Sequence, residues 1–591
     1  MTNNILQNCF AKTQLFLKSH WLACALTLLV GIFTFIPQIL AARSIGNSYQ
    51  GFPFLYAANE DYYISRARDI VEGYWFVGSP FLFEHKNNLP IVFPTGEYLY
   101  ALPAIILGVS VMSVALFAKF LLPAALFALV YVLLYQLSDR SNFNKWAAAA
   151  GGLLVTLGFD FVDYANTLNL LLWKKEILHV NLWTRPVNPI SGALFLFIFL
   201  ILIVQITRSD KKRYFISAGI LLGIMPGYIF SWIVAWTFIG TLGIILLLKK
   251  QFTIIKKFLY LAGISVIASA PFIYSWVSSL AAADGQFTAL RNGLMLTRTP
   301  IVNKVVLLQT VLFLPFFVLE FYKHRKQRKQ LDSWWWYATS LVGANWIVFN
   351  FQIITGKTVW PPHFVQFTVP FAMLTIVLLI NNYLSKKYAK IAWLTVCALI
   401  SVTIIYGLTS ALSYRFVKEK FAALQEGMPL FEWLNKNSQK DCVVLVREKK
   451  ESLANWIPAF THCNVYTSNY AFTRVPLDRL EHNYLTTLRL RGIDKKNVEQ
   501  YLWEHKDQVR ELFYTDWVQL FLQPDESWLA EPIQKIKSDY EKFLKKDFVT
   551  ELKKYKIDYI AGMEELPKAL TTQLKSIKYI GKFGSVYIYQ L

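Results

Sequence analysis

The sequence predicts a polytopic α-helical membrane protein that ends in a soluble α/β domain, and three observations predict this fold class. Apolar runs of roughly 20 residues, the length that crosses a bilayer core as a helix, recur between residues 1 and 410. The short segments between these runs concentrate Lys and Arg. After residue 412 the composition becomes that of a soluble domain.

The first apolar run, "WLACALTLLVGIFTFIPQIL", is too long for a cleavable signal peptide and has no small-residue cleavage pattern. We therefore expect it to remain as a membrane anchor. With the runs that follow it, the sequence predicts about eleven spans, near 21–41, 115–136, 146–160, 190–206, 214–228, 229–248, 258–276, 302–322, 333–353, 363–382 and 391–411.

Basic loops set the predicted orientation. The segments "TRSDKKRY", "LKKQFTIIKK", "YKHRKQRKQ" and "LSKKYAK" all fall on one side if the N-terminus is cytoplasmic, which is the usual side for such loops. An odd number of spans then places the C-terminal domain outside the cytoplasm. We expect a multi-pass protein of the cytoplasmic (inner) membrane. Because this bias explains the net charge of +22, we expect no nucleic-acid partner.

Two domains are expected: a membrane domain over 1–411, with a large first outer loop over 42–114, and an extracytoplasmic α/β domain over 412–591. In the second, "DCVVLVRE" predicts a buried strand, "VPLDRLEHNYLTTLRLRG" a helix stopped by glycine, and "IKYIGKFGSVYIYQL" a terminal hairpin. The five cysteines show no metal-ligand spacing. Cys442 and Cys463 either form a disulfide or remain two free thiols.

The first outer loop holds an acidic pair at the start of a predicted helix, in "AANEDYYISRARDIVEGYWF". Asn59 is a good N-cap, and Glu60 and Asp61 fall in the first turn, where the helix dipole stabilises acids. The helical spacing predicts a helix that lies along the membrane surface with its charged side turned into a cavity. The pair is therefore either a helix cap or a catalytic group.

Two further groups of charged residues follow the acidic pair. The segment "FEHK" brings together Glu84, His85 and Lys86, and Lys119 lies inside the second span near its outer end. An ionisable residue at that depth is a candidate for function, although a lysine near a helix end can also reach back to water.

These motifs resemble a known family. The acidic pair after the first span is followed by a Y-x-x-x-x-R pattern from Tyr63 to Arg68, then "EGYW", then "FEHK" ahead of prolines, then "GVS" and a cation in the second span. This order is similar to that in the polyprenyl-phosphate-dependent glycosyltransferases of the GT-C superfold, nearest to the aminoarabinose transferase and protein mannosyltransferase branch. The resemblance covers the first outer loop and the second span, and it implies that an acid of this loop acts as the catalytic base or orients the acceptor.

The sequence departs from the family pattern at the acidic pair. The family usually has Asp-Glu, whereas this chain has Asn59, Glu60 and Asp61. Either carboxylate could be the base, and we prefer Asp61 because it shares a helix side with Arg68. The chain also lacks prolines directly after Lys86, which weakens any transfer of the aminoarabinose specificity.

The resemblance implies a base for the acceptor and cations for the carrier phosphate, and these residue types suit that chemistry. The catalytic candidates are Asp61, Glu60, Glu84 and Arg68. The candidates for holding the phosphate and donor are Lys86, Lys119, Arg185 in "WTRPVNP", Lys357 in "TGKTVWPPH" and His363. Arginine suits bidentate phosphate binding, yet Arg185 could equally reach the membrane interface beside a proline-started helix.

The loop "FDFVDYANTLNLLLWKKEILHV" brings Asp160 and Asp163 within reach of the same predicted cavity. A divalent cation is a candidate cofactor, but no acid or histidine pair has a helix-facing ligand spacing, so no metal ligand is assigned. The segment "GKTVW" is not a nucleotide-phosphate loop, which favours a lipid-linked donor over a nucleotide sugar.

The sequence thus predicts an integral membrane glycosyltransferase that moves a sugar from a polyprenyl-phosphate donor to an envelope glycan, lipid or protein on the outer face. A transporter or flippase of lipid-linked glycans is the alternative, but it would be expected to show matched halves and charges near the midplane. A glycan polymerase or ligase is a further alternative, although such proteins seldom carry an outer C-terminal domain of this size.

Overall fold

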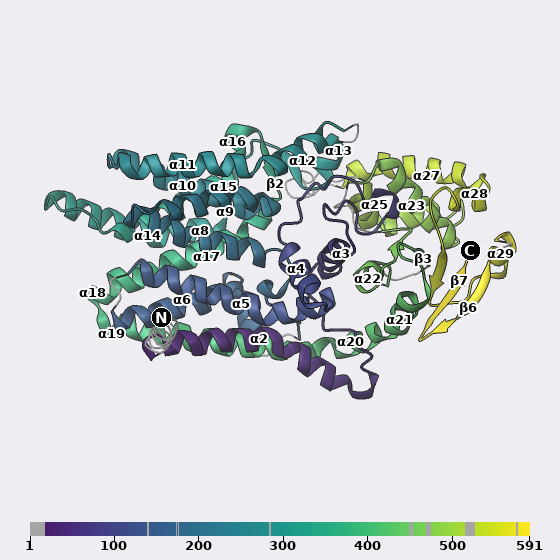
Figure 1. Cartoon of the computed structure of the whole chain (residues 1–591), viewed down its shortest axis with the longest axis horizontal. Coiled ribbons are helices and arrows are strands. Elements are labelled where there is room, and N and C mark those ends of the chain that lie inside the picture. The colour runs from purple at the N-terminus through teal and green to yellow at the C-terminus, as the bar shows by residue number, and fades with distance from the viewer. Residues whose placement is uncertain are drawn as a thin grey trace, which may run out of the picture.

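The computed structural model describes residues 18–138, 141–172, 174, 176–282, 285–447, 453–468, 474–513, 526–574 and 577–591. Figure 1 shows a bundle of long helices that run side by side, with a C-terminal domain of short helices and a sheet at one end. We call the helix ends nearest this domain the domain end of the bundle, and the opposite ends the far end.

Eleven bundle helices lie at the eleven positions that the sequence predicts for spans. They are α2 (Trp21–Ile45), α5 (Val111–Gln136), α6 (Asn142–Thr156), α8 (Ile190–Arg208), α9 (Lys212–Ile224), α10 (Ile229–Leu248), α11 (Phe252–Ala268), α14 (Lys304–Lys326), α15 (Ser333–Asn350), α17 (Pro361–Leu379) and α19 (Ala389–Leu412).

Not all eleven helices pass a test of length and composition alone. In the part of the chain that the structure describes, seven helical stretches are long and apolar enough to cross a membrane, or eight if the bent pair α11 and α12 (Ala270–Leu280) is one span. The helix α6 has 15 residues and is not among them, and neither is α15. The stretch Lys212–Leu248 counts once, although it contains both α9 and α10.

This stretch reverses direction between α9 and α10. Gly219 of α9 packs against Ile264 of α11, and Gly223 packs against Ala268, so α9 and α11 run parallel. The helix α10 connects the end of α9 to the start of α11 and must run antiparallel to both. The turn is the short helix η5 (Met225–Tyr228), which contains a proline. The two helices therefore fill the two predicted spans.

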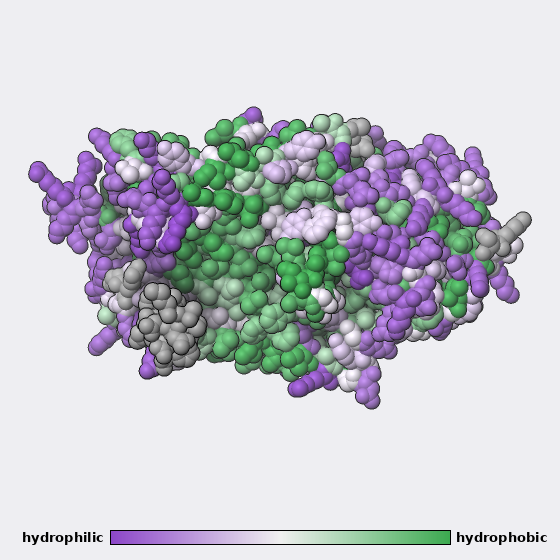
Figure 2. All heavy atoms as spheres, in the orientation of Figure 1, coloured by the Kyte–Doolittle hydropathy of each residue, from purple (hydrophilic) through white to green (hydrophobic). Residues whose placement is uncertain are grey.

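The outer surface of the bundle is apolar. Figure 2 shows hydrophobic side chains over the middle of the molecule, and polar side chains over the far end and the C-terminal domain. Large apolar side chains are exposed along α11 and α14, among them Leu259, Ile267, Leu308 and Leu319. An exposed apolar surface of this extent is typical of contact with lipid tails.

Short elements occupy the domain end and the loops of the bundle. They are α3 (Glu60–Val71), α4 (Tyr98–Leu107), α7 (Tyr164–Leu171), α13 (Gly285–Arg291), α16 (Gln352–Thr355), α18 (Ser385–Lys387) and an antiparallel pair of strands, β1 (Leu294–Leu296) and β2 (Lys357–Val359).

The helix α3 lies between the bundle and the C-terminal domain. It packs against α4 and α5 of the membrane part and against α22 (Leu453–Phe460) of the C-terminal domain. Nine of its twelve residues are buried, including Glu60 and Asp61. Asn59 stands at the predicted N-cap position, but its backbone is left-handed (φ 59°) and its side chain makes no capping bond. The charged residues of α3 thus face protein on more than one side.

The C-terminal domain packs helices against a five-stranded mixed sheet. Its other helices are α20 (Lys418–Leu424), α21 (Met428–Asn437), α23 (Leu477–Leu490), α24 (Val498–Glu504), α25 (Lys506–Phe513), α27 (Ala530–Leu544), α28 (Phe548–Leu552) and α29 (Lys568–Gln573). Its strands, in the spatial order β4-β3-β5-β7-β6, are β3 (Val443–Arg447), β4 (Asn464–Val465), β5 (Tyr559–Gly562), β6 (Lys578–Phe583) and β7 (Val586–Gln590).

The sheet contains the predicted elements of this domain. The strand β3 is parallel to β4 and β5, and β6 and β7 form the predicted antiparallel hairpin. The predicted helix is α23, and Gly492 follows it with a left-handed backbone (φ 73°), which only glycine adopts without strain. The three local predictions for this domain are therefore confirmed.

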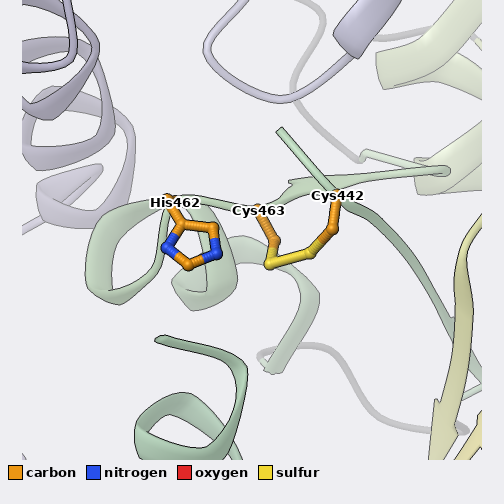
Figure 3. A group of neighbouring side chains, drawn as sticks. All are labelled: Cys442, His462 and Cys463. Atoms are coloured by element: carbon orange, nitrogen blue, oxygen red, sulfur yellow. A yellow bond between two sulfur atoms is a disulfide. The ribbon is translucent and has the colours of Figure 1, made fainter. Parts of the chain in front are cut away.

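A disulfide joins Cys442 and Cys463, which settles the alternative that the sequence left open. The two cysteines directly precede β3 and the neighbouring strand β4, and both side chains are buried (Figure 3). The bond therefore fixes the entry of both strands into the sheet.

Replacing both cysteines by serine should destabilise the C-terminal domain by about 3 kcal/mol, because closing a loop of this length removes that much unfolded-state entropy. Thermal unfolding of the purified full chain, compared with wild type under non-reducing conditions, measures the loss. Cys397→Ser, at an exposed free cysteine in the bundle, is the control and should change little. An unchanged double variant would show that the bond adds no stability.

Candidate functional site

A buried ion pair joins the first turn of α3 to the second predicted span. Lys119 of α5 places Nζ 2.8 and 3.0 Å from the two carboxylate oxygens of Glu60. The backbone N–H of Ala57 donates a further bond of 2.9 Å to Glu60 Oε1. Burial raises the pKa of Glu60, and the charge of Lys119 opposes that rise. The carboxyl is thus held in place and is a better proton acceptor than an exposed glutamate.

This ion pair faces a cavity at the domain end of the bundle. The cavity has about 600 Å³ of empty volume, counting the part open to solvent. Its walls come from α2, α3, α5, α19 and the loops on either side of α7. Besides Glu60 and Lys119, the polar groups that line it include Gln38, Asp160, His179, Asn181, Tyr406, Ser410 and Ser413.

Asp160 and His179 form a second polar group in this cavity. Tyr406 of α19 donates its hydroxyl to Asp160 Oδ2 at 3.1 Å, and the His179 ring lies 6.5 Å from the Tyr406 ring. Burial raises the pKa of Asp160 and lowers that of His179. The sequence placed Asp160 near the cavity, as observed, but it gave no signal for Tyr406, because a tyrosine in an apolar span is common.

Arg185 lies beside α3 but does not line the cavity. Its Nη2 is 3.2 Å from the hydroxyl of Tyr63, one helical turn after Glu60, and its guanidinium lies over the Tyr63 ring. Only 9% of the side chain is exposed, and Nε has no partner among the described residues. The positive charge of Arg185 stabilises the ionised form of Glu60 and the neutral form of His363. A buried cation with a spare donor therefore stands next to the acid.

The remaining predicted residues divide into three groups: Asp61, then His363 with Lys357, and then Arg68, Glu84 and Lys86. Asp61 is buried, and its Oδ1 accepts a bond of 2.9 Å from the N–H of Tyr62, but it does not line the cavity. His363 is stacked between the rings of Trp360 and Phe230 near Arg185. Lys357 is exposed on β2.

The third group, Arg68, Glu84 and Lys86, lies at the junction with the C-terminal domain. Arg68 pairs with Glu72 at 2.8 Å, one turn along α3, and Glu84 lies 3.6 Å from Arg479 of α23. Arg68 pairs locally with Glu72 and does not line the cavity, so a shared helix side with Arg68 does not place Asp61 at the cavity.

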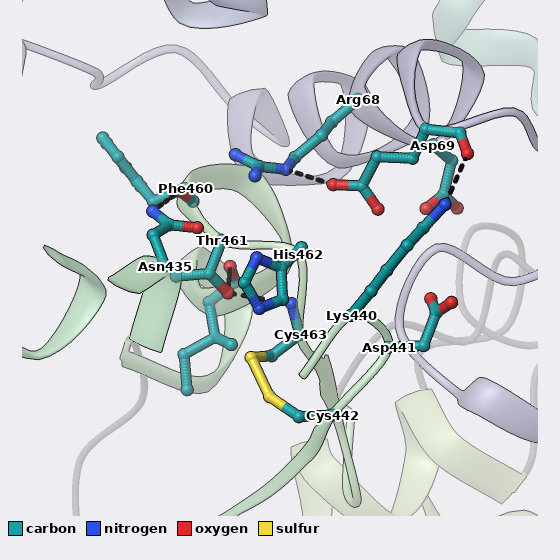
Figure 4. Close-up of polar contacts among 12 residues, drawn as sticks. Arg68, Asp69, Asn435, Lys440, Asp441, Cys442, Phe460, Thr461, His462 and Cys463 are labelled. Carbon is teal, nitrogen blue, oxygen red and sulfur yellow. Dashed lines mark hydrogen bonds and ion pairs between the residues drawn. A yellow bond between two sulfur atoms is a disulfide. The ribbon is translucent and has the colours of Figure 1, made fainter. Parts of the chain in front are cut away.

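Lys86 is shared between the two domains. Its Nζ lies 3.1 Å from Asp69 of α3 and 2.7 Å from Asp441, the residue before the disulfide. Tyr74 donates its hydroxyl to Asp441 at 2.7 Å, and Lys440 donates to the carbonyl of Glu72 at 2.8 Å. Figure 4 shows Lys440, Asp441 and the disulfide facing Arg68 and Asp69 of α3. We call this contact the domain junction.

Asp69 is the carboxylate of the domain junction whose pKa is raised. Burial raises its pKa to about 6, and the neighbouring carboxylates Glu72 and Asp441 add to that rise against the effect of Lys86. Its Oδ2 is buried and has no partner among the described residues. The sequence gave no sign of this role, because Asp441 lies 355 positions after Lys86.

One group of metal-ligand type occurs in the described part of the chain. The ligand atoms of Cys442, His462 and Cys463 lie within 4.8 Å of one another. The two sulfurs are bonded to each other, however, so the cluster offers no thiolate to a metal (Figure 3). We assign no metal to it.

Comparison with known proteins gives structural neighbours only. No family model matches the chain, and no curated protein matches it. The chain is similar to ArnT from Cupriavidus metallidurans, solved bound to undecaprenyl phosphate, at 9% identity and a TM-score of 0.48, covering 96% of this chain and 97% of that chain.

The chain is also similar to the oligosaccharyltransferase AglB from Archaeoglobus fulgidus, solved with an inhibitory peptide and a dolichol-phosphate. The identity is 11% and the TM-score 0.44, covering 92% of this chain and 70% of that chain. Both neighbours are GT-C transferases, the group that the first-loop motifs resemble. At TM-scores below 0.5, these likenesses carry no weight for the activity of this chain.

Replacing Lys86 by Met should destabilise the protein by about 3–5 kcal/mol, because Asp69 and Asp441 would lose their shared cation in a buried setting. Lys440→Met is the matched control, since Lys440 is exposed and should cost less than about 1 kcal/mol. Thermal unfolding of the full chain in lipid nanodiscs measures both. Equal losses would contradict a central role for Lys86.

The raised pKa of Asp69 predicts a pH dependence of stability. The folded chain holds this proton more tightly than the unfolded chain, so the contribution of Asp69 to stability falls as pH rises from about 4 to about 6. Asp69→Asn should flatten the unfolding free energy over that window. Asp163→Asn, at an exposed position, should leave the slope as in wild type. An unchanged slope in Asp69→Asn would refute the raised pKa.

Proposed function

We propose that this protein is a glycosyltransferase that moves a sugar from a polyprenyl-phosphate carrier to an acceptor at the domain end of the bundle. The observation that carries the proposal is the buried pair of Glu60 and Lys119, which faces a cavity between membrane-spanning helices. A base and a cation at the edge of a membrane are the groups that this reaction requires.

The transfer needs three events at this site. The acceptor hydroxyl or amine attacks the anomeric carbon of the sugar, its proton passes to a carboxylate, and the bond from that carbon to the phosphate oxygen breaks. The electron pair of the broken bond leaves with the phosphate, so negative charge grows there. Nearby cations lower the energy of that state.

Glu60 is our choice for the base. Its carboxylate lines the cavity, whereas that of Asp61 does not. Its raised pKa brings its proton affinity nearer to neutral pH, which improves a general base. Asp61 remains the second candidate, because it lies in the same helical turn.

Lys119 and Arg185 are our choice for the phosphate. Lys119 already touches Glu60 and can shift toward an incoming anion, which would release the carboxylate to take a proton. Arg185 has a spare buried donor beside Tyr63, and arginine binds phosphate well. His363 lies near Arg185 and adds a ring to this side. Lys86, Arg68 and Glu84 act through the domain junction instead.

The proposal includes an orientation and a division of labour. The basic loops favour a cytoplasmic far end, so that the cavity and residues 412–591 lie on the outer face of a cytoplasmic membrane. Residues 1–411 would then form the catalytic membrane domain, and the C-terminal domain would hold α3 in place and contact the acceptor.

Glu60→Gln should reduce transfer by about 10²–10⁴-fold, because it removes the base but keeps the shape of the side chain. Mass spectrometry of envelope glycans, from cells lacking the protein and rescued with each variant, measures the effect. The control is Glu176→Gln, at an exposed acid of a neighbouring loop.

The expected result is a sugar that is absent in the null strain, restored by wild type and by Glu176→Gln, and absent with a stably expressed Glu60→Gln. Full rescue by Glu60→Gln, and then by Asp61→Asn, would overturn the transferase proposal and favour transport of a lipid-linked glycan.

A further inference from the structure

The lining of the cavity has an apolar part and a polar part. On the membrane side, α2 contributes Phe33 and Pro37, and α19 contributes Gly407 and Ala411. Only 28% of the apolar window of each helix is buried, so both helices lie at the edge of the bundle, against lipid. An apolar chain can therefore lie along this part of the lining.

The rest of the lining carries the charged groups, and their arrangement does not suit a phosphate. Lys119 balances Glu60, and His179 is neutral near pH 7 because burial lowers its pKa. Lys119 is the only Lys or Arg among the described residues of the lining, and Asp160 has no cation within ion-pair distance among them, so the lining offers no unpaired cation. An anionic head would therefore have to displace Glu60 from Lys119 to find a cation here.

The Asp160 group has unused capacity for hydrogen bonds. The Asp160 carboxylate receives one side-chain bond, from Tyr406, and an ionised carboxylate can accept several. Ser410 and Ser413, which also line the cavity, bond backbone atoms of His179, which fixes the position of that residue at the cavity. A head that donates hydrogen bonds, and that is neutral or positive, fits this part of the lining.

We propose that this cavity binds an amphiphile whose head presents hydroxyl or amino groups to Asp160 and His179, and that this molecule is the acceptor of the transfer. The second clause rests on the proposed function, and the first does not. The carrier phosphate then lies on the Arg185 side of α3, and it meets Lys119 only when Lys119 shifts away from Glu60. Glu60 lies between the two, within reach of the acceptor.

The test uses three short probes with one alkyl chain and different heads: octylamine, octyl β-glucoside and octyl phosphate. Each is titrated into the full chain in phosphatidylcholine nanodiscs, and the shift in thermal unfolding gives an apparent Kd. The variant is Asp160→Asn, which keeps the shape and removes the charge. The matched control is Asp163→Asn, three residues along in the same loop and exposed.

Octyl phosphate should bind wild type more weakly than either other probe. Asp160→Asn should weaken octylamine about tenfold, as expected for the loss of a charge-assisted hydrogen bond, while Asp163→Asn should not. If Asp160→Asn weakens octyl glucoside by the same factor, the cavity binds heads with hydroxyl groups as well. If it weakens only octylamine, the cavity binds heads with amino groups. His179→Gln should weaken octyl glucoside, and it replaces Asp160→Asn if that variant does not fold.

Two results would overturn the inference: equal affinities in the Asp160 and Asp163 variants for both probes, or tighter binding of octyl phosphate than of the other two. The two proposals can fail separately. If Glu60→Gln abolishes the envelope sugar but Asp160→Asn does not change the apparent Kd of the probes, only the assignment of the cavity is wrong. If Asp160→Asn weakens binding of the probes but Glu60→Gln and Asp61→Asn both restore the envelope sugar, the amphiphile site remains and the proposed transfer is wrong.

Discussion

The ion pair between Glu60 and Lys119 sets the geometry of the whole site, because it joins a loop helix to the interior of a membrane-spanning helix. Both side chains are buried, so neither charge is stable without the other. The pair therefore fixes the depth and the rotation of α3. Once these are fixed, Tyr63 meets Arg185 one turn later, and Asp69 reaches Lys86 near the other end of the helix.

α3 thus connects two structures that the chain builds separately. Its first turn belongs to the cavity, and its last turns belong to the domain junction. The disulfide lies next to Asp441 on the other side of that junction, so the part of the C-terminal domain that meets Lys86 is covalently tied to the sheet. If Glu60 performs chemistry, a distant domain contributes to its position without touching the substrate.

The sequence predicts the positions of the bundle helices because hydropathy and loop charge are local properties. It also identifies Glu60 and Lys119, since a charge inside or beside an apolar run stands out. It does not predict which side of α3 faces the cavity. Arg68 and Asp61 share a side by spacing, yet Arg68 pairs locally with Glu72, and Lys86 pairs with Asp441, which lies 355 positions later in the chain. Long-range contacts of this kind leave no local signal, and the same holds for Tyr406 with Asp160.

The distance along the chain between Lys86 and Asp441 has a consequence for biogenesis. During synthesis the first loop emerges long before the segment that carries Asp441, so Lys86 and Asp69 lack this partner while ten further bundle helices are made. Non-local contacts of this kind form late, since closing the intervening chain costs entropy before any contact repays it. A chain that stops before residue 441 would keep its membrane helices but lack the partner that neutralises Lys86 from that side. The order of translation therefore delays the finished site until the last domain has folded.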